Sequence, residues 1–197
     1  EKQTQLLRVA KEKAEHEARI DILTGLTNRR AFMEQTENIA RQAKAGAIPK
    51  MHCLMLDIDY FKRVNDQYGH AGGDRVLVEV ASLLKGIVRE TDVVARLGGE
   101  EFAIITLDHE VVEAYKLAER IRLAISKYPL LLQQQSVPLT ISIGVASWQV
   151  GDEIELLIQR ADKALYKAKN AGRNQVTLFD AGEQGPQITE GYFLDAR

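Results

Sequence analysis

The sequence predicts an α+β fold in which helices surround an antiparallel or mixed sheet of about five strands. After a first helix, the core order of strand-like and helix-like segments is β-α-β-β-α-β, followed by a further helix and a short strand. Two neighbouring strand-like runs are separated only by Gly98-Gly99, which favours a tight hairpin because two-residue turns need positive φ angles. The helix-like segments are apolar on one side only, so each can cover one face of the sheet. This is a ferredoxin-like, palm-type order of elements.

The first half of the expected domain begins with a helix that follows Asn28, a residue type that caps helices well. This helix should end near Gly46 and Pro49. The next segment, residues 51–56, is a short apolar run that predicts a buried strand, and it ends in Asp57-Ile58-Asp59. A short helical turn at 60–66 should then lead into a longer helix, which precedes the hairpin.

The second half should contain a helix, a β-rich strand at Leu139–Ala146, a last helix ended by Gly172, and a final strand at Gln175–Phe179. In the strand, Gly144 indicates that another part of the backbone approaches closely. Spacings of three and four residues mark the expected inner faces of the four helices. In chain order these are Phe32, Ile39, Ala40, Ala43; Leu77, Val80, Ala81, Leu84, Val88; Ala114, Leu117, Ala118, Ile121, Ile125; and Ile154, Leu157, Ile158, Ala161, Leu165, Ala168.

The composition is that of an ordinary globular domain, with 45% hydrophobic and 27% charged residues among 197. A net charge of −2 gives no reason to expect nucleic-acid binding, so a polyanionic substrate would have to be met by local cations. The single cysteine, Cys53, lies in an apolar run and should be a small buried hydrophobe. The absence of a disulfide framework and of an apolar run of about 18 residues predicts a reducing, cytoplasmic location and no membrane segment.

Three regions are expected along the chain. Residues 1–20 carry many charges and neither Gly nor Pro, which favours an exposed helix: either the end of a signalling stalk from an upstream module or a solvated helix. Residues 21–180 should form the domain, and residues 181–197 a loose tail. Because the chain begins with Glu, we expect it to be the cytoplasmic part of a longer protein, which could be bound to a membrane elsewhere.

Two acidic clusters predict a metal site. Glu100 and Glu101 follow the hairpin glycines, although glutamate is depleted in strands. Asp57 stands at the end of a buried strand, where a carboxylate is costly unless it is paired or bound to a metal. If that strand lies beside the hairpin, Asp57 and Glu100 can converge. Two carboxylates, a carbonyl oxygen and waters suit Mg²⁺.

These segments resemble the GGDEF family of diguanylate cyclases. Gly98-Gly99-Glu100-Glu101-Phe102 is similar to the family signature in its Glu-Glu variant, with Glu in place of Asp at the third position. Four more blocks resemble family motifs in order, over residues 21 to about 180. They are Asp21–Arg30, Asp57–Asp66, Tyr68–Asp74 and Ala161–Asn174. The resemblance implies the same palm-type, nucleotide-cyclase-like fold and a bacterial signalling enzyme that joins two GTP into cyclic di-GMP and releases two pyrophosphates.

The resemblance also implies roles for the acidic residues and one lysine. Asp57, the Ile58 carbonyl and Glu100 would bind Mg²⁺ (or Mn²⁺), and the metal would clamp the attacking and leaving oxygens. Glu100 would accept the proton of the 3′-hydroxyl, directly or through metal-bound hydroxide. Lys62 would stabilise charge in the transition state.

Substrate-binding roles follow in the same way. Asn65 and Asp74 would read guanine, because a carboxylate can accept from its N1–H and its 2-amino group together, or they would serve only as helix caps. Lys62, Lys169 and Arg173 would contact phosphates, although the last two also fit a solvated basic helix end. Gly69, Gly72 and Gly73 could let backbone N–H groups approach phosphate. His70 would contact the nucleotide or make a structural hydrogen bond, and Phe61 would shape the guanine pocket.

A second ligand site is implied by Arg89-Glu90-Thr91-Asp92, just upstream of the hairpin. It resembles the family's RxxD motif, at which the product binds as an inhibitor. Arg89 can fork onto guanine or phosphate, and Asp92 can accept from the guanine edge. Arg120 is a second arginine for the same ligand, or else a solvated helix residue.

The main hypothesis is an active cyclase that works as a homodimer, because one domain holds one GTP and two must face each other. An upstream sensor domain would act through residues 1–20. Two alternatives remain: a non-catalytic module that senses cyclic di-GMP or GTP, and a cyclase with another nucleotide choice. The first predicts decayed site residues, and the second is opposed by Asp74.

Overall fold

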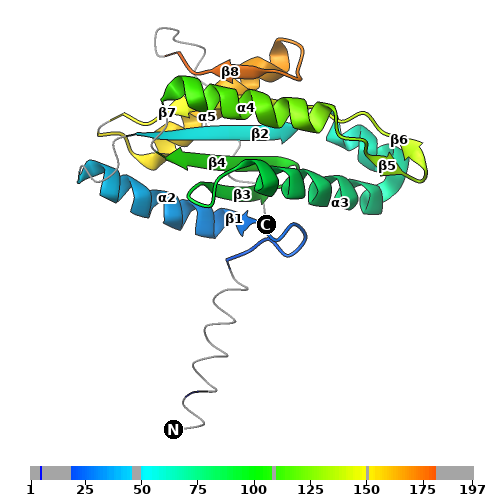
Figure 1. Cartoon of the computed structure of the whole chain (residues 1–197), viewed down its shortest axis with the longest axis horizontal. Helices are drawn as coiled ribbons and strands as arrows, with labels where there is room; N and C mark the ends of the chain where they lie inside the picture. Colours follow the sequence, from blue (N-terminus) through cyan, green and yellow to red (C-terminus); the bar gives the residue numbers. More distant parts are fainter. Residues whose placement is uncertain (1–4, 6–18, 46–49, 108–109, 150, 181–197) are drawn as a thin grey trace.

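The computed structural model describes residue 5 and residues 19–45, 50–107, 110–149 and 151–180. At its centre is a six-stranded sheet in the order β1-β3-β4-β2-β7-β8 (Figure 1). The four middle strands are β2 (Met51–Ile58), β3 (Val93–Gly98), β4 (Glu101–Leu107) and β7 (Ile141–Ser147). With one helix after β2 and another after β4, they form the βαββαβ core, which confirms the predicted α+β, ferredoxin-like class.

Strand direction decides where the site lies. β2 pairs antiparallel with both β4 and β7, and β3 pairs antiparallel with β4. β2 and β3 therefore run the same way, and they end at the same end of the sheet, where β4 and β7 begin. Two short edge strands, β1 (Thr27–Asn28) and β8 (Val176–Leu178), add in parallel to β3 and β7.

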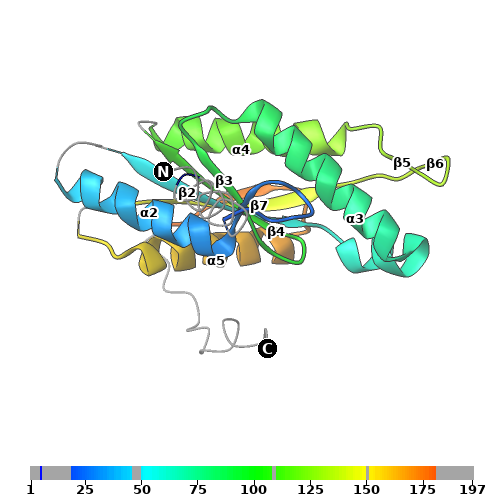
Figure 2. The ribbon, with the colours of Figure 1, turned by 90° about the horizontal axis from the view of Figure 1, so that it is seen from below.

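Helices cover both faces of the sheet (Figure 2). α3 (Phe61–Ile87) and α4 (Val111–Ser126) pack on one face, and α2 (Arg29–Lys44) and α5 (Ile154–Asn170) pack on the other. The side chains of β2 alternate between the two cores, because successive residues of a strand point to opposite faces. Leu54, Leu56 and Ile58 belong to the α3–α4 side, and Cys53 and Met55 to the α2–α5 side. Asp57 continues the second series, so its side chain faces α5.

Local signals explain most of these elements. The Asn28 side chain accepts a hydrogen bond from the Ala31 N–H at 3.0 Å, which confirms the predicted cap of α2. The predicted inner faces of the four helices are buried, except that Ile39 is half-buried and Val88 lies just past the end of α3. Cys53 is buried as predicted, and burial raises the pKa of its thiol to about 12.

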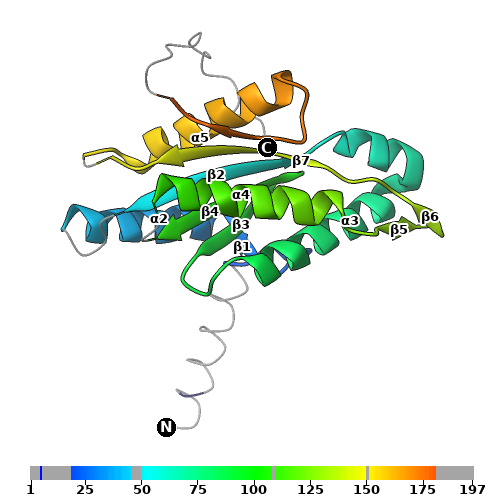
Figure 3. The same ribbon diagram turned by 45° about the horizontal axis from the view of Figure 1, so that its top comes forward.

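The helical turn expected at 60–66 leads into the longer helix as predicted, because α3 consists of two helical segments joined across a kink at Gly69 (φ 72°). Other elements differ from the expectation. β1 and the small hairpin of β5 (Leu131–Leu132) and β6 (Gln135–Ser136) were not predicted. Figure 3 shows that β5 and β6 lie beside α3, away from β8 and α5.

The ends of the chain fall largely outside this description. The helix expected over residues 1–20 lies outside the described residues except at 5, 19 and 20, and the tail expected at 181–197 lies wholly outside them. Within the described part of the chain, no helix combines the length and the apolar character needed to cross a bilayer.

Candidate active site

Two acidic segments that are far apart in sequence meet at the end of β2. Asp57 stands opposite Glu101 in the β2–β4 register, and the Ile58 N–H donates to the Glu100 carbonyl at 3.3 Å. Glu100 itself lies in the two-residue turn between β3 and β4, after Gly99, whose φ of 49° suits glycine. The structure thus brings Asp57, Ile58 and Glu100 together.

Asp57 is a buried carboxylate in crowded acidic surroundings. Only 6% of the residue is exposed, and its Oδ2 lies 2.7 Å from Nζ of Lys169, near the end of α5. Burial is the largest influence and raises the pKa of Asp57 to about 6; Lys169 opposes this rise, while Glu100 and Glu101 add to it. Burial likewise raises the pKa of Glu101. Such a group of carboxylates would be stabilised by a bound cation.

The donor set at this point fits Mg²⁺. Asp57, Glu100 and the Ile58 carbonyl offer hard oxygen ligands, and they are too few to surround the ion. Mg²⁺ commonly binds through one or two carboxylates and completes its octahedron with water and substrate phosphates. Over the described ranges, no group of three or more His, Cys, Asp or Glu side chains is arranged as a metal site by itself.

Asp59 has a structural role that the sequence did not reveal. It accepts hydrogen bonds from Thr140 Oγ1 (2.8 Å), Ser142 Oγ (2.7 Å) and the Asn174 N–H (2.9 Å). These bonds tie the turn after α5 to the end of β2. Asp59 is thereby satisfied by protein donors and is separate from the acidic pair.

Four basic residues lie on the segments that adjoin the acidic centre. Lys169 contacts Asp57, and Arg173 lies in the turn after α5 with its guanidinium 4.7 Å from the centre of the Tyr60 ring. Arg63 contacts the same ring at 4.5 Å. Lys62 is exposed in the first turn of α3. Positive charge from two helices thus lies beside the end of β2, as a polyanionic substrate requires.

The proposed guanine readers lie along the first turns of α3. Phe61 is buried, Asn65 is half-buried, and His70 and Asp74 are exposed. A Cβ added to Gly73 would lie 1.9 Å from Asn65 Oδ1 and 3.2 Å from the Phe61 ring. Gly73 therefore leaves room for the side chains of Asn65 and Phe61.

The cap interpretation of Asp74 is wrong. The helix restarts directly after Gly69, so Asp74 lies inside the helix and not at its start. Gly72 faces the Tyr68 Cβ, at 2.5 Å from an added Cβ, so Gly72 and Gly73 both permit close packing of side chains. The hypothesis that these glycines approach phosphate stays a prediction.

A second candidate site lies in the loop between α3 and β3. The Arg89 N–H donates to Asp92 Oδ2 at 2.9 Å, and the Asp92 N–H donates to the Arg89 carbonyl at 3.0 Å. Both residues line a cavity of about 290 Å³. Asp92 Oδ1 is buried and has no hydrogen-bond partner among the described residues, which leaves an acceptor for a ligand. Arg120 donates to the Ile87 carbonyl at 2.8 Å, which brings α4 near this loop.

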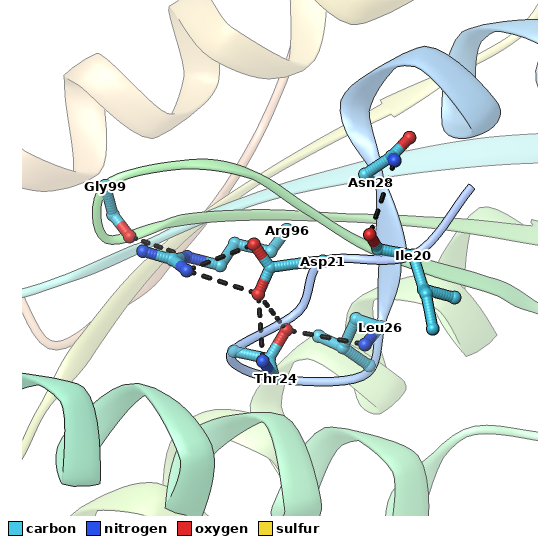
Figure 4. Close-up of polar contacts among 7 residues, drawn as sticks. All are labelled: Ile20, Asp21, Thr24, Leu26, Asn28, Arg96 and Gly99. Atoms are coloured by element: carbon cyan, nitrogen blue, oxygen red, sulfur yellow. Dashed lines mark hydrogen bonds and ion pairs between the residues drawn. The ribbon is translucent and has the colours of Figure 1, made fainter. Parts of the chain in front are cut away.

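Two charged residues near the turn were given no role from sequence. Arg96 donates from Nε to the Gly99 carbonyl at 3.0 Å, and Asp21 lies against its guanidinium (Figure 4). Asp21 and Arg96 both belong to segments that resembled family motifs. The position of Arg96 as a charged residue inside an apolar strand was the feature of the sequence that could have indicated a role for it.

Comparison with known proteins identifies the family to which this chain is similar. The family described as "Diguanylate cyclase, GGDEF domain" matches residues 18–175. The response regulator PleD of Caulobacter vibrioides is 43% identical over 159 residues, which cover 79% of this chain and 35% of PleD. Diguanylate cyclase DgcM of Escherichia coli is 42% identical over 166 residues, covering 84% of this chain and 39% of DgcM. The chain spans less than half the length of these relatives.

A solved structure shares the fold closely. The coiled coil and GGDEF domain of DgcB from Caulobacter crescentus, in complex with c-di-GMP, superposes with a TM-score of 0.85 at 33% identity. The match covers 89% of this chain and 93% of that one. With the family match and the geometry at the end of β2, the chain belongs to the GGDEF domain family of diguanylate cyclases.

Proposed function

We propose that this chain is an active diguanylate cyclase that condenses two GTP into cyclic di-GMP and two pyrophosphates, with Mg²⁺ or Mn²⁺ as cofactor. The observation that carries the proposal is the meeting of Asp57, Ile58 and Glu100 beside Lys169. Relatives described as diguanylate cyclases, such as DgcM, support the same reaction. Residues 21–180 would be the catalytic unit, working in the cytoplasm, where GTP is available.

The residues divide the chemistry between them. Each 3′-hydroxyl attacks the α-phosphorus of the other nucleotide, and Glu100 accepts the proton of that hydroxyl. Asp57, Ile58 and Glu100 hold the divalent ion, which neutralises charge on the triphosphate when bound. Lys62, Lys169 and Arg173 contact the phosphates, and Lys62 also stabilises the charge that develops on the leaving group. Phe61, Asn65, His70 and Asp74 form the nucleoside pocket.

The decisive experiment is chromatography of the products after incubation with GTP and Mg²⁺. Formation of cyclic di-GMP and pyrophosphate is expected. If nucleotide binds but no product forms, the chain is a sensing module and the proposal fails. A parallel incubation with ATP, alone and mixed with GTP, separates a diguanylate cyclase from a cyclase of another nucleotide choice.

The reaction should need two copies of the chain. One domain holds one GTP, so the two reacting nucleotides must face each other across a two-fold axis. An upstream sensor would control the pairing through residues 1–20. Specific activity is therefore expected to fall as the enzyme is diluted through the range in which dimers dissociate. Constant specific activity in solutions that sedimentation shows to be monomeric would contradict a dimeric catalyst.

Asp74→Asn is expected to weaken the selection of GTP over ATP. A carboxylate accepts from both the N1–H and the 2-amino group of guanine, whereas an amide has one acceptor and presents donors as well. We expect the ratio of kcat/KM for the two nucleotides to fall by roughly 100-fold. Asp66→Asn, an exposed acid on the same helix, is the matched control and should keep the ratio. Equal ratios for wild type and Asp74→Asn would remove Asp74 from the guanine site.

Arg89→Ala is expected to relieve inhibition by the product. Arg89, Asp92 and Arg120 would hold cyclic di-GMP, and loss of a forked arginine contact typically costs tenfold or more in affinity. The concentration of cyclic di-GMP that halves the initial rate should rise by about tenfold or more. Arg41→Ala, an exposed arginine on α2, serves as the control. Unchanged inhibition in Arg89→Ala would argue that the loop does not bind product.

A further inference from the structure

The segment that enters the domain is connected to the catalytic turn through two charged side chains. Arg96 lies between Asp21 and Gly99 in Figure 4. Its Nη1 is 3.2 Å from both carboxylate oxygens of Asp21, and its Nε donates to the Gly99 carbonyl at 3.0 Å. The side chains are only 15% (Arg96) and 23% (Asp21) exposed, so solvent competes weakly with these contacts.

The Asp21 carboxylate is held in place by its own turn. Thr24 donates to Asp21 Oδ1 from its N–H (2.9 Å) and its hydroxyl (2.6 Å). The Asp21 N–H donates to the Leu26 carbonyl at 2.8 Å, and Leu26 is buried in the core. Lys85 of α3 donates to the Gly25 carbonyl at 2.9 Å. The carboxylate that meets Arg96 is therefore fixed by the fold.

The charge state of Asp21 agrees with this geometry. Burial tends to raise the pKa of Asp21, but the hydrogen bonds from Thr24 and the Arg96 guanidinium outweigh burial, so the pKa lies below its usual value. The carboxylate is ionised at neutral pH and can hold the guanidinium.

The turn on the other side of Arg96 needs such a restraint. Gly98 and Gly99 have φ angles of 153° and 49°, and glycine can leave such conformations at little cost. The Gly99 carbonyl and the Glu100 N–H belong to the same planar peptide group. A hydrogen bond that holds the Gly99 oxygen therefore also sets the orientation of the backbone from which Glu100 projects.

We propose that Asp21 and Arg96 are positioning residues that hold the Gly99–Glu100 peptide so that the Glu100 carboxylate faces Asp57. This inference rests on the proposed cyclase function of the same site. The nucleoside pocket on α3 does not depend on this link, so its loss affects turnover more than substrate binding. A displacement of about 1 Å in a catalytic group can lower the rate by roughly 100-fold.

The test compares Asp21→Asn and Arg96→Lys with wild type in the same chain. In each variant we expect kcat to fall by roughly 10- to 100-fold, while KM for GTP stays within about twofold. Lys keeps the charge, but it lacks the planar fork that reaches Asp21 and Gly99 together. Because the two residues act as one link, the double variant should be no worse than the more damaged single variant.

Glu34→Gln is the matched control. It breaks the Arg19–Glu34 ion pair (2.8 Å), which ties the same entering segment to α2 without contacting the hairpin. This variant should keep the kcat of wild type. Hydrogen–deuterium exchange of the hairpin peptide around residues 96–102 should be faster in Asp21→Asn and unchanged in Glu34→Gln.

The inference would be overturned by unchanged hairpin exchange in Asp21→Asn, or by a loss of kcat that Glu34→Gln shares. A loss of activity that only follows a lower Tm would do the same. If wild type itself makes no cyclic di-GMP, the proposed function fails, while the exchange experiment still tests the link from Asp21 to the turn.

Discussion

Glu100→Gln is expected to reduce cyclic di-GMP synthesis by roughly 1,000-fold or more while leaving the fold intact. Glutamine has nearly the size and shape of glutamate, but it carries no charge and does not accept a proton at neutral pH. The substitution therefore removes an anionic metal ligand and the proposed base together. Glu100 lies half-buried in the turn, outside both hydrophobic cores, so the free energy of unfolding should change little.

The measurement is initial-rate product formation with GTP and Mg²⁺, combined with thermal unfolding of the same samples. Glu37→Gln, on the exposed side of α2, makes the same chemical change away from the site and should behave like wild type. A Glu100→Gln variant that kept a tenth of the wild-type rate would exclude Glu100 as the base. A variant that lost activity together with its Tm would point to a structural role instead.

The fold could be predicted where the local signals are strong. Asn28 caps α2, and Leu77 and Ile121 lie on helical faces that the spacing identified. The predicted hairpin forms, with its two-residue turn at Gly99-Glu100, one residue later than the Gly98-Gly99 pair. β1 was missed because a strand of two residues has no periodicity to detect. The break between the two helical segments of α3 was predictable because Gly69 takes a non-helical conformation there, and the second segment begins directly after it.

The site could be predicted only in part, because the partners of a charged residue are set by the packing of elements that are distant in the sequence. The meeting of Asp57 with Glu100 followed from placing the strand beside the hairpin. The contact of Lys169 with Asp57 was not foreseen, since it depends on how α5 crosses the sheet. Asp59 looks like Asp57 in the sequence, but its donors come from residues about 80 and 115 positions later.

The packing of α5 on β7 gives the prediction with the largest effect on stability, Gly144→Ala. An added Cβ would lie 2.1 Å from both the Ala161 carbonyl oxygen and the Leu165 nitrogen, which are backbone atoms of α5. Backbone atoms of a helix cannot change position by rotating about a bond as a flexible side chain can, so α5 must move away from the sheet. We expect a loss of about 3 kcal/mol or more in the free energy of unfolding, a large part of the stability of a typical domain.

Urea denaturation measures this loss, and Gly86→Ala is the control. Gly86 lies in α3 with no atom near an added Cβ, so alanine there should stabilise the chain by about 0.5–1 kcal/mol. Changes of opposite sign in the free energy of unfolding at Gly144 and Gly86 would show that the close approach of α5 to Gly144, and not the loss of a glycine, decides the effect. An unchanged midpoint in Gly144→Ala would mean that α5 can move away at little cost. Because α5 also carries Lys169, any Gly144→Ala protein that still folds should place that ammonium less well beside Asp57 and should turn over GTP more slowly.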